Sequence, residues 1–111
     1  MSGWTVEFLD KLVEEEFERL PSDMQASIGR IISLIESHGL PRVIMPYVRH
    51  LRGKIWEMRG KARDGIARSV YITVTGKRVV ILRSFVKKTR QTPSQEIEIA
   101  VRRAREAGYE P

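Results

Sequence analysis

The sequence predicts an α+β fold, with an N-terminal strand and a helical hairpin packed on a mainly antiparallel sheet and with a C-terminal helix. Three observations support this fold class. Residues 9–38 carry apolar side chains at helical spacing, residues 55–87 contain three apolar segments joined by short turns, and residues 92–107 repeat the helical spacing. The elements follow one another closely, and the length of 111 residues predicts a single domain over residues 1–111.

The N-terminal part is expected to form the strand and the helical hairpin. Residues 4–8 alternate apolar and polar side chains, which predicts a strand. Apolar residues then recur at helical spacing in two segments that Pro21 separates. They are Leu9, Leu12, Val13, Phe17 and Leu20 in the first helix and Met24, Ile28, Ile31, Ile32 and Ile35 in the second. Ser22 and Gln25 form a capping-box pattern at the start of the second helix, and Gly39 is suited to end it.

The C-terminal part is expected to form an antiparallel meander followed by a helix. The predicted strands are residues 55–60, 66–75 and 78–87, with a turn signal at residues 75–77. Thr92 is predicted to cap the last helix, with Pro93 in its first turn, and the helix is expected to run to about Ala107. Its inner face is expected to contain Ile97, Ala100, Val101 and Ala104.

Alternation along the predicted strands separates two faces of the sheet. One face is apolar and suited to be covered by helices. It carries Trp56, Met58, Val80, Leu82, Ser84 and Val86. The opposite face gathers Glu57, Arg59, Arg83, Phe85 and Lys87 if the strands are neighbours.

Arg68 is the unusual residue of the predicted sheet, because it shares the parity of Ile66, Val70 and Ile72. Arginine is rarely buried unless it is paired. Either a β-bulge redirects the side chain, or it reaches a carboxylate such as Glu57. Arg68 is therefore either a phosphate-binding residue at the edge of a cleft or half of a buried ion pair that fixes the sheet.

Charge is distributed unevenly along the chain. Residues 1–41 contain three Lys/Arg and eight Asp/Glu residues, for a net charge of −5, whereas residues 42–111 contain seventeen and six, for a net charge of +11. The acidic run at residues 14–16 is expected on the outer face of the first helix. The basic part favours a polyanionic partner such as a nucleic acid, with a solvated basic surface as the alternative.

Composition also limits the chemistry and the location of the protein. The sequence contains no cysteine, which excludes disulfides and thiolate metal sites. His38 and His50 are isolated, and no spacing of His, Asp and Glu indicates a metal site, so neither a metal nor a cofactor is expected. No signal-peptide pattern and no run of about 18 apolar residues is present. We expect a cytoplasmic protein that does not contact membranes.

Cleavage of RNA requires few groups, and the predicted polar face contains suitable ones. Arginine suits a phosphate because the guanidinium matches two phosphate oxygens. Glu57 is a candidate general base, and Lys87 is a candidate point charge or proton donor. Phe85 or Trp56 could stack on a base, although Phe85 alone more often packs. Residues 87–90 form a basic loop at the end of this face, which favours contact with RNA.

Four segments occur together in an order and spacing that are typical of one protein family. They are His50-Leu51-Arg52-Gly53 followed by Ile55-Trp56-Glu57-Met58-Arg59; Ala67-Arg68-Ser69-Val70-Tyr71; Val80-Ile81-Leu82-Arg83-Ser84-Phe85-Val86-Lys87-Lys88-Thr89; and Thr92-Pro93 leading to Glu96-Ile97 and Ala100. Through these segments, residues 48–107 resemble the phage-derived, HigB-type branch of the RelE toxin superfamily. One departure is Ala67, which stands where the family usually has an aromatic residue before the arginine.

The resemblance implies a ribosome-dependent messenger-RNA endonuclease, the toxin of a type II toxin–antitoxin system. Such toxins inhibit translation in the ribosomal A site, need no metal, and are neutralised by a helix-turn-helix antitoxin. By family position, Arg68 engages the scissile phosphate, Arg59 is a basic position on the preceding strand, and Lys87 lies where further catalytic groups occur. Glu57 is the carboxylate of the Trp-Glu-Met-Arg motif.

Further residues are expected to bind RNA. They are Arg83, Phe85, Lys88, Arg90 and Lys61. Two alternatives remain beside the enzyme: a non-catalytic RNA-binding or ribosome-binding module, and an inactive toxin that acts mainly through its partner. Arg59, Arg68 and Lys87 together favour the enzyme, because simple binding could use lysines anywhere on the basic surface.

Overall fold

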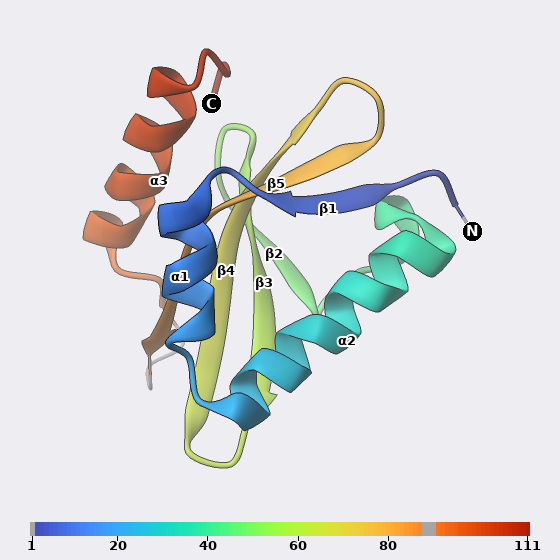
Figure 1. Cartoon of the computed structure of the whole chain (residues 1–111), viewed down its shortest axis with the longest axis vertical. Coiled ribbons are helices and arrows are strands. Elements are labelled where there is room, and N and C mark those ends of the chain that lie inside the picture. The colour runs from blue at the N-terminus through green and yellow to red at the C-terminus, as the bar shows by residue number, and fades with distance from the viewer. Residues whose placement is uncertain (1, 88–90) are drawn as a thin grey trace.

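The computed structural model describes residues 2–87 and 91–111, which form a five-stranded sheet with helices on both faces (Figure 1). The elements are β1 (Thr5–Phe8), α1 (Lys11–Glu18), α2 (Ser22–His38), a 3-10 turn η1 (Leu40–Arg42), β2 (Val48–Arg52), β3 (Ile55–Ala62), β4 (Gly65–Val74), β5 (Arg78–Lys87) and α3 (Ser94–Glu106). No helix in this part of the chain is long and apolar enough to cross a membrane.

The strand order is β1-β5-β4-β3-β2. β1 runs parallel to β5, and the other neighbours are antiparallel, which confirms the predicted α+β fold with its mainly antiparallel sheet. β2 was not predicted. It forms the edge of the sheet by pairing with β3, where Val48 lies opposite Met58 and Arg49 lies opposite Glu57.

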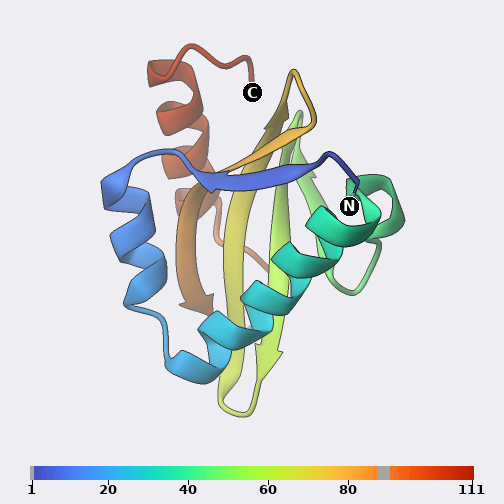
Figure 2. The same ribbon diagram turned by 45° about the vertical axis from the view of Figure 1, so that its right-hand side comes forward.

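Two apolar cores hold the helices on opposite faces of the sheet (Figures 1 and 2). The first core joins α1 and α2 to Met58, Tyr71 and Ile81. The second joins α3 to Ile72 and Leu82. The prediction that helices cover a single face is therefore wrong, because α3 buries part of the face that carries Glu57 and Arg83.

A β-bulge in β5 changes the predicted alternation. Val70 lies opposite Arg83 and Tyr71 lies opposite Ile81, so the register skips Leu82. Two residues of β5 thus face one position of β4, and alternation restarts after the bulge. As a result, Val80 and Leu82 share the α3 side with Phe85, and the prediction that Val80 and Leu82 lie opposite Phe85 is wrong.

A glycine allows α2 to approach the sheet closely. A Cβ built on Gly60 of β3 would lie 2.9 Å from side-chain carbons of Ile28, which is fully buried on α2. Contacts this short require the helix or strand to shift. Gly60 therefore fixes the distance between α2 and β3, and with it the position of the sheet edge beside α2.

Side-chain capping differs from the prediction at two of the helices. Pro21 and Pro93 are the N-caps of α2 and α3, and neither helix has a side-chain capping bond, so the predicted caps Ser22 and Thr92 are wrong. Gln25 instead donates through Nε2 to the carbonyl of Glu18, the last residue of α1, and to that of Leu20 just beyond it. The predicted end of α2 is confirmed: Gly39 is its C-cap, with φ of 89°.

Candidate functional site

A fully buried carboxylate, Glu57 on β3, lies at the centre of the candidate site. Arg68 on the neighbouring β4 is also fully buried. The hydroxyl of Thr92 connects them, because it accepts a hydrogen bond from Nη1 of Arg68 at 2.9 Å and donates one to Oε1 of Glu57. The segment that precedes α3 therefore covers and links two charged residues of the sheet.

Arg59 connects this buried carboxylate to the surface. Its Nε lies 3.6 Å from Oε2 of Glu57, and its side chain is 16% exposed. Its backbone N–H donates to the carbonyl of Tyr47 at 2.8 Å, which ties β3 to the residue just before β2 begins. We call Glu57, Arg59, Arg68 and Thr92 the Glu57 cluster.

Positive charge exceeds negative charge in the Glu57 cluster. Burial lowers the pKa of the Arg68 guanidinium from its ordinary value. The charge of Glu57 opposes this shift, whereas the charges of Arg59 and Arg49 add to it. An anion bound beside Arg59 or Arg49 would offset the repulsion between these cations, so the cluster is suited to a phosphate group.

Two cavities adjoin the Glu57 cluster. A polar cavity of about 550 Å³ is lined by Arg49, His50, Leu51, Lys87, Gln91, Thr92, Pro93 and Ser94. A larger cleft of about 1070 Å³ lies between α2 and the edge of the sheet, and Arg59 and Lys61 line it. Arg49 and Gln91 line both. Among residues 2–87 and 91–111, no three His, Asp or Glu side chains are grouped as metal ligands.

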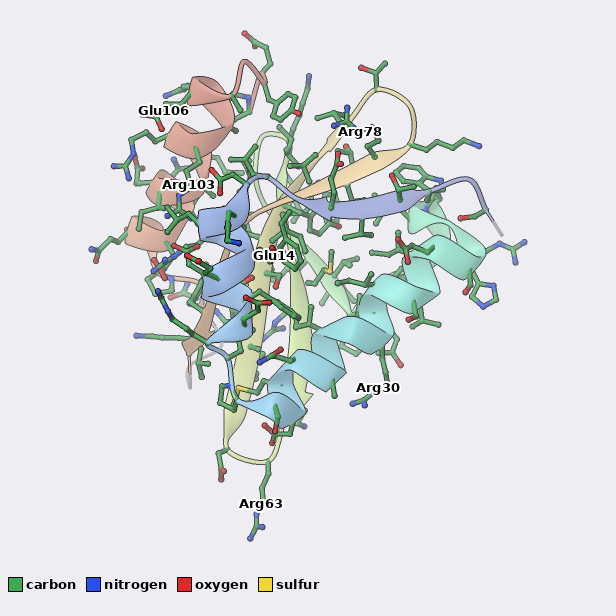
Figure 3. The ribbon with its side chains drawn as sticks, in the orientation of Figure 1. Glu14, Arg30, Arg63, Arg78, Arg103 and Glu106 are labelled. Atoms are coloured by element: carbon green, nitrogen blue, oxygen red, sulfur yellow. The ribbon has the colours of Figure 1, made fainter. Side chains whose placement is uncertain are left out.

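A second charged cluster joins α1, β5 and α3, and we call it the α1–α3 cluster. Arg83 contacts Glu16 at 2.7 Å and Glu96 at 3.3 Å, and Arg103 contacts Glu16 at 2.7 Å. Figure 3 shows Arg103 on the side of α3 that approaches α1. The expectation that Glu16 lies on the outer face of its helix is wrong, because its side chain is only 9% exposed.

The charges of the α1–α3 cluster stabilise one another. Burial acts to raise the pKa of Glu16, but the hydrogen bonds and charges of Arg103 and Arg83 hold it below its ordinary value. The hydrogen bonds that Arg103 donates to Glu16 also raise the pKa of Arg103. Two carboxylates and two guanidinium groups balance in this cluster, which ties both helices to the sheet.

The structure brings some of the predicted site residues together and separates others. Glu57, Arg59 and Arg68 share one cluster, and Lys87 lines the adjoining polar cavity. Lys61 is exposed in the larger cleft. The remaining candidates are elsewhere: Arg83 lies in the α1–α3 cluster, Phe85 packs against the α3 core, and Lys88 and Arg90 lie outside the described residues.

The burial of Arg68 limits what it can contact. Thr92 bonds its Nη1, and none of the side chain is exposed. A direct contact between Arg68 and a phosphate would therefore require Thr92 to move away. In the arrangement described, Arg59 and Arg49 line the larger cleft beside the Glu57 cluster, as does Arg30 of α2.

Two residues of this site escaped the sequence analysis. Arg49 lies on β2 opposite Glu57, and residues 48–52 (Val-Arg-His-Leu-Arg) have no regular alternation of apolar and polar types that would have indicated a strand. Thr92 was assigned to a helix cap, and its sequence context before a proline supports that role equally well. Only the tertiary fold shows that its hydroxyl is bonded to the sheet.

Comparisons with known proteins agree with the fold. Residues 15–105 match the family described as "Phage derived protein Gp49-like (DUF891)". A search of curated proteins found no match. Among solved structures, a chain in the crystal structure of the archaeal RelE–RelB complex from Pyrococcus horikoshii OT3 is 20% identical, with a TM-score of 0.55, over 80% of this chain and 99% of that chain. The chain therefore has a RelE fold and belongs to the phage-derived Gp49-like family, a family of RelE/HigB-type toxins.

Proposed function

We propose that this chain is the toxin of a type II toxin–antitoxin system and that it cleaves messenger RNA in the ribosomal A site. The observation that carries the proposal is the excess of positive charge in the Glu57 cluster beside two cavities. No Asp or Glu among the described residues lines either cavity. A polyanion is the ligand that such a surface attracts most strongly.

In the proposed reaction, the 2′-hydroxyl oxygen of one nucleotide attacks the adjacent phosphorus and the 5′-oxygen leaves. Arg59 and Arg49 would bind the phosphate oxygens, and Lys87 would supply a further positive charge or a proton for the leaving oxygen. Oε2 of Glu57 accepts no hydrogen bond from the described residues, which makes it the oxygen that could accept the proton of the 2′-hydroxyl. Arg68 would position Glu57 through Thr92.

The partners follow from the resemblance and from the neighbouring fold. The printed title of the archaeal structure names a complex of RelE with RelB. We propose by analogy that an antitoxin, of the helix-turn-helix type that the resemblance implies, neutralises this chain in the cytoplasm. The reaction as drawn uses only side chains of this chain, and we propose that it needs no metal or cofactor.

A second candidate function is non-catalytic binding to RNA or to the ribosome on the same surface. The complete burial of Glu57 and Arg68 favours this candidate, because neither side chain is exposed to a substrate. Cleavage requires access to Oε2 of Glu57 or to another proton acceptor, whereas binding requires only the exposed cations.

Induced expression tests both candidates. We expect growth arrest, with cuts in translated messages and few cuts in the same RNA when it is not translated. Arg59→Gln should relieve the arrest, whereas Arg102→Gln, an exposed position on α3, should not. Arrest without cut messages would support the binding module, and normal growth with soluble, folded protein would contradict both.

A further inference from the structure

We propose that the cleft between α2 and the β2–β3 edge of the sheet binds one nucleotide of a single-stranded RNA, with Tyr47 stacking on the base and Arg30 contacting a phosphate. This inference rests on the proposed function and identifies how the RNA is held beside the Glu57 cluster. The cleft is lined by Ser27, Arg30, Ile31, Leu34, Met45, Pro46, Tyr47, Arg49, Arg59, Lys61, Ile66 and Gln91.

The path of the chain creates the cleft. The first β2 residue that pairs with β3 is Val48, opposite Met58, so the residues before Val48 leave the sheet while β3 continues. Tyr47 lies at this point. Its carbonyl accepts the N–H of Arg59 at 2.8 Å, and its own N–H donates to the carbonyl of Ile44 at 3.0 Å. The backbone of Tyr47 is thus held on both sides, while 46% of the residue is exposed.

A fixed and exposed tyrosine suits base stacking. Base–aromatic stacking tolerates any base, and a tyrosine whose backbone is already held loses less conformational entropy when a base stacks on its ring. Ile31 and Leu34 of α2 and Ile66 of β4 supply apolar surface in the same cleft. Together they can cover the faces of a base, which a purely basic surface would not do.

Cations surround this apolar surface. Arg30, Arg49, Arg59 and Lys61 line the cleft, and no Asp or Glu of the described residues does. Among residues 2–87 and 91–111, no carboxylate lies within ion-pair distance of Arg30 or Lys61. Figure 3 shows Arg30 projecting from α2 on the side away from α1. The combination of the stacking surface with the cations Arg30 and Lys61 fits a nucleotide, which presents a flat base and a charged phosphate.

The cleft is continuous with the proposed reaction site. Arg59 lines the cleft and also contacts Glu57, while Arg49 and Gln91 line the polar cavity that contains Lys87 and Thr92. An RNA strand can therefore extend from Tyr47 past the Glu57 cluster to Lys87. An acidic segment of a protein would satisfy the cations but would not use the stacking surface of Tyr47.

The test measures binding of a short, uridine-rich RNA with methylated 2′-hydroxyls, which this chemistry cannot cut, by fluorescence anisotropy with the full chain. Tyr47→Ala should weaken binding about tenfold, and Tyr47→Phe, which keeps the ring, should stay within about twofold. Arg30→Gln should weaken binding and reduce the slope of log affinity against log salt by about 0.7, the value for one phosphate contact on a single strand. Arg102→Gln is the matched control and should leave the slope unchanged.

Photo-crosslinking of a 4-thiouridine version of the RNA gives an independent measurement. The crosslink is expected in the tryptic peptide of residues 43–49, which contains Tyr47. Unchanged affinity of Tyr47→Ala and Arg30→Gln, in a chain that still cuts translated messages, would overturn this inference and leave the proposed function intact. If the unmodified chain neither cuts translated messages nor binds this RNA, both proposals are wrong. If it binds an acidic leucine–glutamate peptide tightly instead of RNA, the cleft is assigned to a protein partner and this inference is wrong.

Discussion

The two charged clusters on the α3 side of the sheet differ in their charge balance. In the α1–α3 cluster, Glu16 and Glu96 face Arg83 and Arg103, so every charge has a counter-charge from a different element. In the Glu57 cluster, one carboxylate faces two arginines, and the charge of Arg49 also acts on Arg68.

The difference separates a structural role from a functional one. A balanced network needs no further ion, and its contacts join α1, β5 and α3. An unbalanced cluster keeps a positive potential that a bound phosphate can offset. The predictions below test this contrast by removing charges from each cluster in turn.

Glu57→Gln is expected to have the largest effect. Removing the carboxylate of the Glu57 cluster would take away a counter-charge of the buried Arg68, and the free energy of unfolding should fall by about 3–5 kcal/mol. Urea denaturation measures the change. Glu98→Gln is the control, because Glu98 forms an exposed pair with Arg52 and its loss should cost less than about 1 kcal/mol. If the two variants have the same free energy of unfolding, the burial of Arg68 does not require the charge of Glu57.

Arg59→Gln should affect activity more than stability. Loss of a phosphate-binding guanidinium should slow cleavage of translated messages about a hundredfold. The free energy of unfolding should change by only about 1 kcal/mol, since Arg59 is partly exposed and Glu57 retains Arg68. Cleavage assays and urea denaturation on one preparation separate the two effects. A large loss of stability with normal cleavage would place Arg59 with the structural residues.

Glu16→Gln should show the opposite pattern in the α1–α3 cluster. We expect normal cleavage but a loss of about 2 kcal/mol of stability at neutral pH, because two arginines lose a charged partner. The folded protein lowers the pKa of Glu16, so this stabilisation is present above the unfolded pKa of about 4.3 and is lost as the pH falls through the folded pKa. Unfolding curves from pH 7 to acid should therefore depend less on pH in Glu16→Gln than in the unmodified chain.

Thr92→Val should have the smallest effect. The substitution removes the hydroxyl that joins Arg68 to Glu57 and should cost about 1 kcal/mol. Thr92→Ser keeps the hydroxyl and is expected to restore most of the loss. If valine and serine variants are equally stable, the hydroxyl bridge does not contribute to the Glu57 cluster.

The sequence was sufficient to predict most of the fold. The apolar spacing of α1, α2 and α3 and the strands of the meander were all recognisable, because those elements bury one side against a core. The edge strand β2 was not predicted, since it is short and its Arg49 and Arg52 are polar. Its extended conformation depends on pairing with β3, which is a non-local interaction.

The candidate site was predictable only in part. Glu57, Arg59 and Arg68 were identified because charged residues within apolar strands are conspicuous. The side of the sheet on which Val80 and Leu82 lie depends on the bulge at Leu82, and an uninterrupted apolar run contains no signal of a skipped register. The ion pairs of Arg83 were also not predictable, because its partners Glu16 and Glu96 lie on two helices that are distant in the sequence.

The parallel pairing of β1 with β5 has a consequence for the time at which the protein becomes active. Residues 5–8 pair with residues 78–81, so the first strand made must wait until nearly the whole sheet has been synthesised. The Glu57 cluster waits longer still, because it needs Thr92 and the docking of α3. A nascent chain in which α3 has not yet docked therefore lacks the assembled Glu57 cluster, and the proposed cleavage would begin only after that docking.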